Sequence, residues 1–171
     1  METLVKRAIQ KDAESFIMLM EQNRQPMLKI AYGFFSNEDD VADVIQQTVL
    51  NAYEHIGELK KPAYFKTWLI RILINNCNQL YNSRKRMLPG TELTEEKYYD
   101  TYPEDNAFFS LLSMLHKDDR IIFQLYYGEE YTTKEISSIL DLNENTVRSR
   151  IHRGKEQLRR QLQREEMDLW N

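Results

Sequence analysis

The stretch YTTKEISSILDLNENTVRSRIHRGKEQLRR, residues 131–160, predicts two short helices joined by a tight turn, and the second helix is strongly cationic. Apolar positions recur at helical spacing at Ile136, Ile139, Leu140, Val147, Ile151, Leu158 and Leu162. The cations that fall away from this stripe are Arg148, Arg150, Arg153 and Lys155. The pattern is typical of a helix-turn-helix, whose second helix fits the major groove of duplex DNA.

Three residues of this stretch predict local backbone features. Asp141 occupies the turn, where the left-handed backbone is usually supplied by Gly and where Asp is tolerated. Asn143 is the expected N-cap of the second helix. Gly154 falls in the apolar stripe, which predicts a close approach of the second helix to a neighbouring backbone.

The rest of the chain is also predicted to be helical. Five Gly and four Pro in 171 residues, with almost no strand-like alternation, indicate an all-α protein. We expect two small helical domains, residues 1–88 and 107–171, joined by an acidic flexible linker over residues 89–106. The linker carries acids and scattered tyrosines and shows no helical period.

The formal net charge of -4 argues at first sight against nucleic acid, because a polyanion is bound by cations. The charges are segregated, however. Residues 36–57 contain five acids and no Lys or Arg, whereas residues 59–91 contain seven cations and no acid. Such blocks indicate several partners of different sign, although solvated surface charge gives the same pattern.

Cys77 is the one cysteine, so no internal disulfide can form, and its apolar helical surroundings predict a buried structural thiol. No signal peptide is recognisable, and no apolar run approaches the roughly 18 residues that span a bilayer. We therefore expect a cytoplasmic protein.

Capping residues and helix breakers predict further helix boundaries. Asp12 is a candidate N-cap, and Pro26 suits the first turn of a further helix. In the second domain, Asp118 or Asp119 is expected to cap a helix that ends at Gly128.

Residues 36–39, Ser-Asn-Glu-Asp, resemble a capping box and open a predicted helix. Acids at a helix N-terminus also suit the helix dipole. Two interpretations of the acids remain open. Glu38, Asp39 and Asp40 are capping charges, or an acidic polar face binds a partner. The candidate face comprises Asp39, Asp40, Asp43, Gln46 and Gln47.

Residues 65–87 predict one long helix, and Arg71, Asn75, Asn78 and Asn82 lie on one face of it at spacings of four, three and four. Asn is a poor helix former and its amide pairs with base edges, so this face is a candidate nucleic-acid surface. The flanking cations that would contact phosphates are Lys60, Lys61, Lys66, Arg84, Lys85 and Arg86. A solvated polar face is the alternative interpretation.

Together the two segments resemble the two domains of a bacterial RNA polymerase sigma factor of the extracytoplasmic-function group, within the sigma-70 family. The resemblance rests on DDVADVIQQT at 39–48, FKTWLIRI at 65–72 followed by Asn75, EIS at 135–137 with Leu140, TVRSR at 146–150 and RG at 153–154. The matching family patterns are DAEDVVQET, F-x-x-W-L-x-x-I-x-x-N and, after E-I-A, T-V-x-S-R-x-x-R-A. Both motifs in this order, separated by an acidic linker, are highly specific, and they cover most of the chain.

The chain also departs from the family. Gln79 stands where the family usually has Asp, and Asn82 where it usually has Arg. Base preference at the upstream end of the minus-10 element therefore cannot be carried over. The segment 114–116 replaces the usual Leu-Pro, and Gly154 replaces the usual Ala.

The resemblance implies two surfaces on the first domain. Asp39, Asp40, Asp43, Gln46 and Gln47 would dock on the coiled-coil clamp helices of the polymerase's largest subunit. The melted non-template strand of the minus-10 element would be held by Lys60, Lys61, Tyr64, Lys66, Arg71, Asn75, Asn78, Gln79, Asn82, Arg84, Lys85 and Arg86. Tyr64 and Tyr81 are the expected exposed aromatics, whereas Trp68 lies on the apolar stripe and is expected in the core.

The second domain would read the minus-35 element as duplex. The residues closest to the groove would be Asn145, Thr146, Ser149, Arg150 and Arg153, with Arg148, His152 and Lys155 on phosphates. The implied partners are bacterial core RNA polymerase, promoter DNA and an anti-sigma factor, which is often membrane-bound. No cofactor, metal, catalytic residue or membrane insertion is expected, and the linker would pass through the RNA exit path.

Two other classes of function compete with this one. A duplex-binding transcription repressor would use the same helix-turn-helix, but it does not account for the Asn face beside a basic cluster. A magnesium-dependent nuclease could use the acids of residues 38–43, but no further acid in the neighbouring basic segment completes the coordination. We therefore predict a promoter-specificity factor and not an enzyme.

Overall fold

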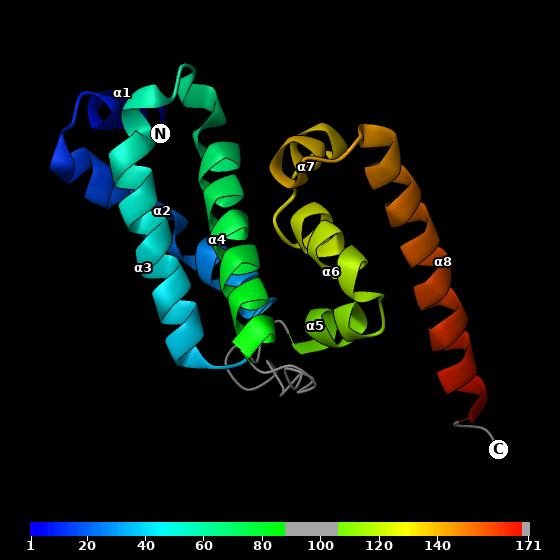
Figure 1. Cartoon of the computed structure of the whole chain (residues 1–171). Helices are drawn as coiled ribbons and strands as arrows, with labels where there is room; N and C mark the ends of the chain where they lie inside the picture. The colour runs from blue at the N-terminus through cyan, green and yellow to red at the C-terminus, as the bar shows by residue number, and fades with distance from the viewer. Residues whose placement is uncertain (88–105, 169–171) are drawn as a thin grey trace. The chain divides into compact units, whose positions relative to one another are not determined.

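The computed structural model describes residues 1–87 and 106–168, and the chain divides into two compact units, Met1–Glu96 and Lys97–Asn171. The described elements of both units are helices, and no strand occurs among these residues (Figure 1). The all-α prediction is therefore confirmed. The predicted linker lies outside the described residues apart from its last position.

The first unit consists of α1 (Glu2–Ile9), α2 (Ala13–Tyr32), α3 (Glu38–His55) and α4 (Phe65–Met87), with short 3-10 helices η1 (Ile56–Glu58) and η2 (Pro62–Tyr64) between α3 and α4. Helices α2, α3 and α4 pack on one another, and α1 packs on α2 and on η1 and η2. Helices α3 and α4 lie side by side (Figure 1). The core contains Leu19, Met27, Ile30, Val41, Val44, Ala52, Leu69 and Leu73.

Two side-chain caps set the starts of α2 and α3. Asp12 caps α2 as predicted, because its Oδ1 accepts a hydrogen bond from the Ser15 N–H at 3.3 Å. This backbone hydrogen bond is the main reason that the pKa of Asp12 lies below its usual value. Asn37 caps α3, one residue after the predicted capping box begins, and its Oδ1 accepts from the Asp40 N–H at 2.8 Å.

Pro26 lies inside α2 and not in the first turn of a new helix, so this predicted boundary was wrong. Proline removes one N–H donor from a helix, but Gln22, whose carbonyl would have accepted it, is an exposed residue. Beyond the proline, Met27, Ile30 and Ala31 are buried. Their burial stabilises the continuation of the helix and offsets the cost of the proline.

The second unit consists of α5 (Asn106–Ser113), α6 (Lys117–Phe123), the π-helical turn η5 (Gln124–Gly128), α7 (Thr133–Leu140) and α8 (Glu144–Asp168). The helix ends at Gly128 as predicted. Helix α8 has 25 residues, so the prediction of a short second helix was wrong. Asp118 and Asp119 lie in the first turn of α6, whose N-cap is His116, so neither is the cap.

The turn between α7 and α8 has the predicted geometry. Asp141 is left-handed, with φ 55° and ψ 45°. The N–H of Leu142 donates to the carbonyl of Ser137 at 3.0 Å, which closes the end of α7. Asn143 caps α8, because its Oδ1 accepts from the Asn145 N–H at 2.8 Å. The predictions for Asp141 and Asn143 are confirmed.

Gly154 allows a close approach, but its neighbour is an aromatic ring and not the predicted backbone. A Cβ at this position would lie 2.4 Å from Cε2 of Phe123 and 3.2 Å from Cδ2 of Leu115. Phe123 belongs to a buried cluster with Phe109, Leu112 and Leu115. The absent side chain of Gly154 is therefore what lets α8 close over the aromatic core of this unit.

Cys77 is fully buried in α4, as predicted. Burial raises the pKa of its thiol, which makes the reactive thiolate scarce. Across residues 1–87 and 106–168, no helix combines the length and the hydropathy that a membrane crossing requires.

Gly154→Ala is expected to destabilise the second unit by about 1 kcal/mol, because overpacking costs about 1–3 kcal/mol and the helix propensity of Ala recovers about 1 kcal/mol. Hydrogen exchange of the α8 amides in the full chain measures this loss. In a Phe123→Leu background the same substitution should be neutral or stabilising. Equal destabilisation in both backgrounds would show that the ring contact is not the cause.

Candidate nucleic-acid interfaces

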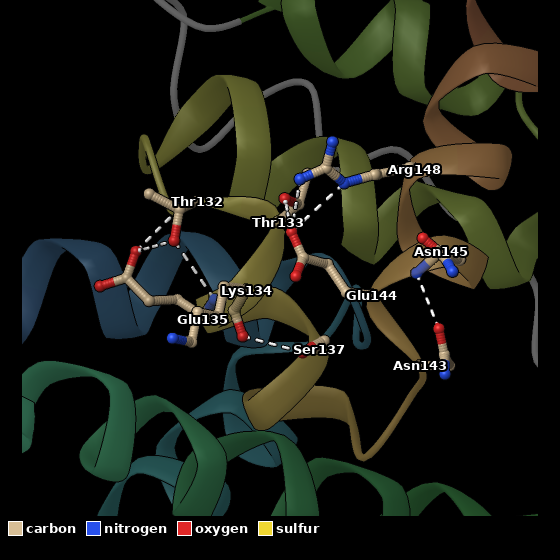
Figure 2. A network of polar contacts seen from close by, with 9 residues as sticks. All are labelled: Thr132, Thr133, Lys134, Glu135, Ser137, Asn143, Glu144, Asn145 and Arg148. Atoms are coloured by element: carbon tan, nitrogen blue, oxygen red, sulfur yellow. Dashed lines mark hydrogen bonds and ion pairs between the residues drawn. The ribbon is translucent and has the colours of Figure 1, made fainter.

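A capping box fixes the start of α7 (Figure 2). The N–H of Glu135 donates to Thr132 Oγ1 at 3.2 Å, and the N–H of Thr132 donates to Glu135 Oε2 at 2.8 Å. These reciprocal bonds satisfy two donors at the helix N-terminus. The first helix of the helix-turn-helix therefore begins at a defined residue.

Glu144 connects α7 to α8 (Figure 2). Its Oε1 accepts from Thr133 Oγ1 at 2.7 Å and from Arg148 Nη2 at 2.7 Å. The bond from Arg148, followed by the bond from Thr133, lowers the pKa of Glu144. Glu144 is therefore ionised at neutral pH and holds the exposed Arg148 guanidinium against the first turn of α8.

The exposed face of α8 carries Asn145, Arg148, Ser149, His152 and Arg153. These residues recur at intervals of three and four, which places them on one side of the helix. His152 lies 3.8 Å from Glu156 through its Nε2, but its side chain is 76% exposed. This face offers cations for phosphates and amide and hydroxyl groups for base edges.

Two of the predicted base-proximal residues are not fully on this face. Arg150 Nη1 lies 3.6 Å from Asp119 Oδ1 and donates to the Asp118 carbonyl at 3.3 Å. Thr146 is half-buried. The structure therefore places Arg150 against the first turn of α6, and its predicted place among the residues closest to a groove stays a prediction.

Lys155 is exposed, but its ammonium group contacts Tyr127 of η5. Its Nζ lies 5.5 Å from the centre of the Tyr127 ring. A hydrogen bond with Tyr127 is the main cause of a raised pKa for Lys155. Lys155 is therefore a cation beside the α8 face whose side chain already has an intramolecular contact.

The predicted polar face of α4 is present and exposed. Its residues are Arg71, Asn75, Asn78, Gln79 and Asn82. The exposed cations near its two ends are Lys60, Lys61, Lys66, Lys85 and Arg86. Asn76, by contrast, is buried. Helical periodicity places Asn76 on a different side of α4 from Asn75, Asn78 and Asn82, but the sequence did not indicate the hydrogen-bond partners of its side chain.

The aromatic residues near this face differ in exposure. Tyr64 is 56% exposed, and Lys61 Nζ lies 5.8 Å from its ring centre. Trp68 is half-buried, with its ring 6.0 Å from that of Phe65. Tyr81, predicted to be exposed, is half-buried as well. Tyr64 is therefore the best placed of the three to stack on a base.

Arg84 and Asp40, predicted on two different binding faces, are bonded to each other. Arg84 Nη2 donates to Asp40 Oδ1, and Asn37 Nδ2 donates to Asp40 Oδ2 at 2.7 Å. The Asp40 side chain is only 4% exposed. Asp40 is therefore buried at the start of α3, and Arg84 in the last turn of α4 is bonded to it. The two predicted binding roles stay predictions.

The acidic face of α3 comprises the exposed residues Asp39, Asp43, Gln46 and Gln47. Gln47 Nε2 donates to Asn51 Oδ1 at 2.8 Å. Leu50, which is 52% exposed, continues the face and was missed. Leu50 follows Asp43 by seven positions, close to two helical turns, so the sequence already indicated that both lie on the same side of the helix.

The acids of α3 do not form a metal site in the structure. In the part of the chain that the structure describes, no three His, Cys, Asp or Glu side chains are grouped so as to hold a metal ion. Asp40, the central acid of the segment, is bonded instead to Arg84 and Asn37.

The two segments match two protein families. Residues 19–87 match Sigma-70 region 2, and residues 105–158 match Sigma-70, region 4. The RNA polymerase sigma factor SigV of Bacillus subtilis (strain 168) is 23% identical, over 88% of this chain and 93% of that protein. The ECF RNA polymerase sigma factor SigW of the same organism is 27% identical, over 95% of this chain and 98% of that protein.

Two solved structures share the fold. CnrH, in complex with the cytosolic domain of CnrY, has a TM-score of 0.72 at 24% identity, over 95% of this chain and 96% of that chain. The sigma factor RpoE, in complex with the anti-sigma factor NepR from Bartonella quintana, has a TM-score of 0.70 at 20% identity, over 88% of this chain and 98% of that chain. At these identities the likeness concerns the fold.

Arg84→Gln is expected to destabilise the first unit by ~1–3 kcal/mol, because the buried Asp40 carboxylate loses its charged partner. Arg86→Gln is the matched control, since Arg86 is exposed near the end of the same helix. Hydrogen exchange of the α3 and α4 amides in the full chain compares the two variants. Equal protection in both would contradict the structural role of Arg84.

Arg153→Ala is expected to reduce the slope of log K against log salt for duplex DNA by about 0.9, because the helix face that meets the polyanion loses one exposed cation. Arg150→Ala should leave that slope unchanged and instead lower the exchange protection of α6 and α8, because its partner is Asp119. Salt titrations of duplex binding, with exchange measured on the same two proteins, test both statements. The reverse pattern would mean that Arg150 leaves Asp119 to bind phosphate.

Proposed function

Because the chain belongs to the sigma-70 family, in its extracytoplasmic-function group, we propose that it binds core RNA polymerase and directs promoter-specific initiation of transcription. The observation that carries the proposal is the order of the two family matches on two units, each of which exposes a polar, cationic helix face. In this role the protein is a specificity factor and not an enzyme.

We assign core polymerase binding to the acidic face of α3. Asp39, Asp43, Gln46 and Gln47 are exposed there, and residues 36–57 contain no Lys or Arg to offset the carboxylates. Such a face attracts a cationic surface and steers its approach. Leu50 adds exposed apolar area at the end of the face. Asp40 is excluded from it, because its carboxylate is buried against Arg84.

We assign the melted non-template strand of the minus-10 element to α4 and η2. Exposed amides of Asn75, Asn78 and Asn82 offer donors and acceptors to base edges, and the flanking lysines and arginines attract phosphates. Unstacking a base costs a few kcal/mol. Stacking on an exposed ring such as Tyr64 offsets about 1–3 kcal/mol of it.

We assign the duplex minus-35 element to α8. Asn145, Ser149 and Arg153 occupy the exposed face over its first turns, where a recognition helix meets base edges. Arg148 and His152 flank them and suit phosphate contacts. Beyond Gly154, Leu158 of α8 packs on the buried cluster of Phe109, Leu112, Leu115 and Phe123, which supports the helix on the side opposite to the exposed face.

We also propose that an anti-sigma factor regulates the protein. The proposal is supported by the two structures of the same fold, one a complex with the anti-sigma factor NepR and the other a complex with the cytosolic domain of CnrY. Core polymerase and promoter DNA lie in the bacterial cytoplasm, so we propose that location for the protein.

Transcription in vitro tests the proposed function. Purified protein, bacterial core polymerase and genomic promoter fragments should yield transcripts that start at defined positions and depend on the protein. A protein that binds operator duplex tightly on its own, and neither binds core nor starts transcripts, would be a repressor and would contradict the proposal.

Asp43→Lys is expected to weaken core binding by at least about tenfold, or ~1.4 kcal/mol, because it reverses the charge at the centre of the acidic face. Glu21→Lys is the matched control, since it makes the same charge change on an exposed residue of α2. Titration of core polymerase with labelled protein measures both affinities. An equal loss in the two variants would show that net charge, and not this face, determines binding.

A further inference from the structure

A buried hydrogen-bond network joins the middle of α3 to the middle of α4. Asn76 is 6% exposed, and its Nδ2 donates to Thr48 Oγ1 at 3.0 Å. Thr48 is fully buried and donates in turn to the Val44 carbonyl at 2.7 Å. On the other side of the amide, Asn51 Nδ2 donates to Asn76 Oδ1 at 3.1 Å. The buried amide therefore has partners for both its donor and its acceptor groups.

A second polar contact joins the same two helices at one end. The ion pair of Asp40 with Arg84 links the first turn of α3 to the last turn of α4. Thr48 follows Asp40 by eight positions, and Arg84 follows Asn76 by eight positions. At the α-helical rise, each interval is about 12 Å. Because the helices are antiparallel and the intervals are equal, both contacts form together in one register.

The polar contacts supply what the apolar packing lacks. Burial of side chains such as Leu69 and Leu73 is favourable but not directional, so several registers of two apolar helix faces bury similar area. A displacement of α4 by one residue would take the buried Asn76 amide away from Thr48 and would leave the buried Asp40 carboxylate with Asn37 but without its cationic partner Arg84. Buried polar groups that lose their partners are costly. Buried polar groups are known to fix register between packed helices in this way.

The network also reaches the surface proposed for polymerase binding. Gln47 on the acidic face donates to Asn51 at 2.8 Å, and Asn51 donates to Asn76. Asn75 and Asn78, on either side of Asn76, are exposed on the face proposed for the non-template strand. Hydrogen bonds thus connect Gln47 on the acidic face of α3, through Asn51, to Asn76 of α4, which lies between the exposed Asn75 and Asn78 in the sequence.

We propose that the Thr48–Asn76 and Asp40–Arg84 contacts are positioning contacts, which hold the α4 reading face in a fixed axial register relative to the α3 docking face. The inference rests on the function proposed above. With α3 bound to polymerase, the register decides where Asn75 and Asn78 meet the melted strand. The four residues act on promoter opening through this placement, without touching polymerase or DNA.

The double variant Thr48→Val/Asn76→Leu tests the inference. It replaces a buried polar pair by apolar groups of similar shape, a change that can be nearly neutral for stability, and it leaves Asn51 half-buried within reach of water. Thr48→Ser is the conservative control, because it keeps the hydroxyl. Three quantities are measured: the midpoint of thermal unfolding, the affinity for core polymerase and the rate of minus-10 opening. The opening rate is measured by the permanganate reactivity of unpaired thymines, on a promoter that the wild-type protein transcribes.

The double variant is expected to keep the thermal midpoint and core affinity and to open the promoter about tenfold more slowly, while Thr48→Ser behaves as wild type. Opening at the wild-type rate would overturn the inference. Slower opening that is accompanied by an equivalent decrease in the thermal midpoint or in core affinity would also overturn the inference, since the contacts would then serve stability or core binding and not the placement of α4.

A second pair of substitutions covers the case in which the first variant does not fold. Asp40→Asn/Arg84→Gln removes both charges of the other contact and keeps an acceptor for Asn37. The same selective loss of opening is expected, and its absence would overturn the inference. A wild-type protein that starts no transcripts with core polymerase would instead contradict the proposed function, so the two failures are distinguishable.

Discussion

The antiparallel packing of α3 on α4 is the contact on which both surfaces of the first unit depend. Its apolar side chains provide the favourable burial. The buried Thr48–Asn76 contact and the partly buried Asp40–Arg84 contact fix the register of the two helices. One consequence is electrostatic, because the acids of residues 38–54 lie on α3 and five cations lie on the neighbouring α4. These cations are Lys66, Arg71, Arg84, Lys85 and Arg86. A single helix pair thus presents a negative face, which we propose binds polymerase, and a positive, amide-rich face, which we propose binds DNA. The two proposed partners need not compete for one surface.

Backbone geometry is the corresponding constraint in the second unit. The left-handed Asp141 turns the chain between α7 and α8. The capping box of Thr132 fixes the start of α7, and the hydrogen bond from Thr133 to Glu144 joins that start to the first turn of α8. Behind the exposed face, Gly154 lets α8 close on the ring of Phe123. The cations of α8 therefore divide into two groups. Arg153 is exposed on the α8 face, whereas Arg150 contacts Asp119 of α6.

Features decided by a few neighbouring residues could be predicted from the sequence. The caps at Asp12 and Asn143 and the turn at Asp141 belong to this kind, and so does the polar face of α4, which follows from helical periodicity. Features that join distant segments could not be predicted. In the sequence Arg84 is one of several cations in a basic cluster, and nothing there indicates its ion pair with Asp40, which lies 44 positions away. The role of Pro26 was predicted wrongly for a related reason. Helix α2 continues past the proline because the residues that follow it are buried against other helices, and the sequence does not show that packing.

Site-specific crosslinking in the assembled complex tests the central claim most directly. A photoreactive amino acid is placed at position 43 on α3 or at position 78 on α4, in complexes of the full chain, core RNA polymerase and promoter DNA. The two-faced helix pair predicts crosslinks from position 43 to the largest polymerase subunit and from position 78 to the non-template strand of the minus-10 element. Crosslinks from position 43 to DNA, or from position 78 to polymerase and not to DNA, would contradict it.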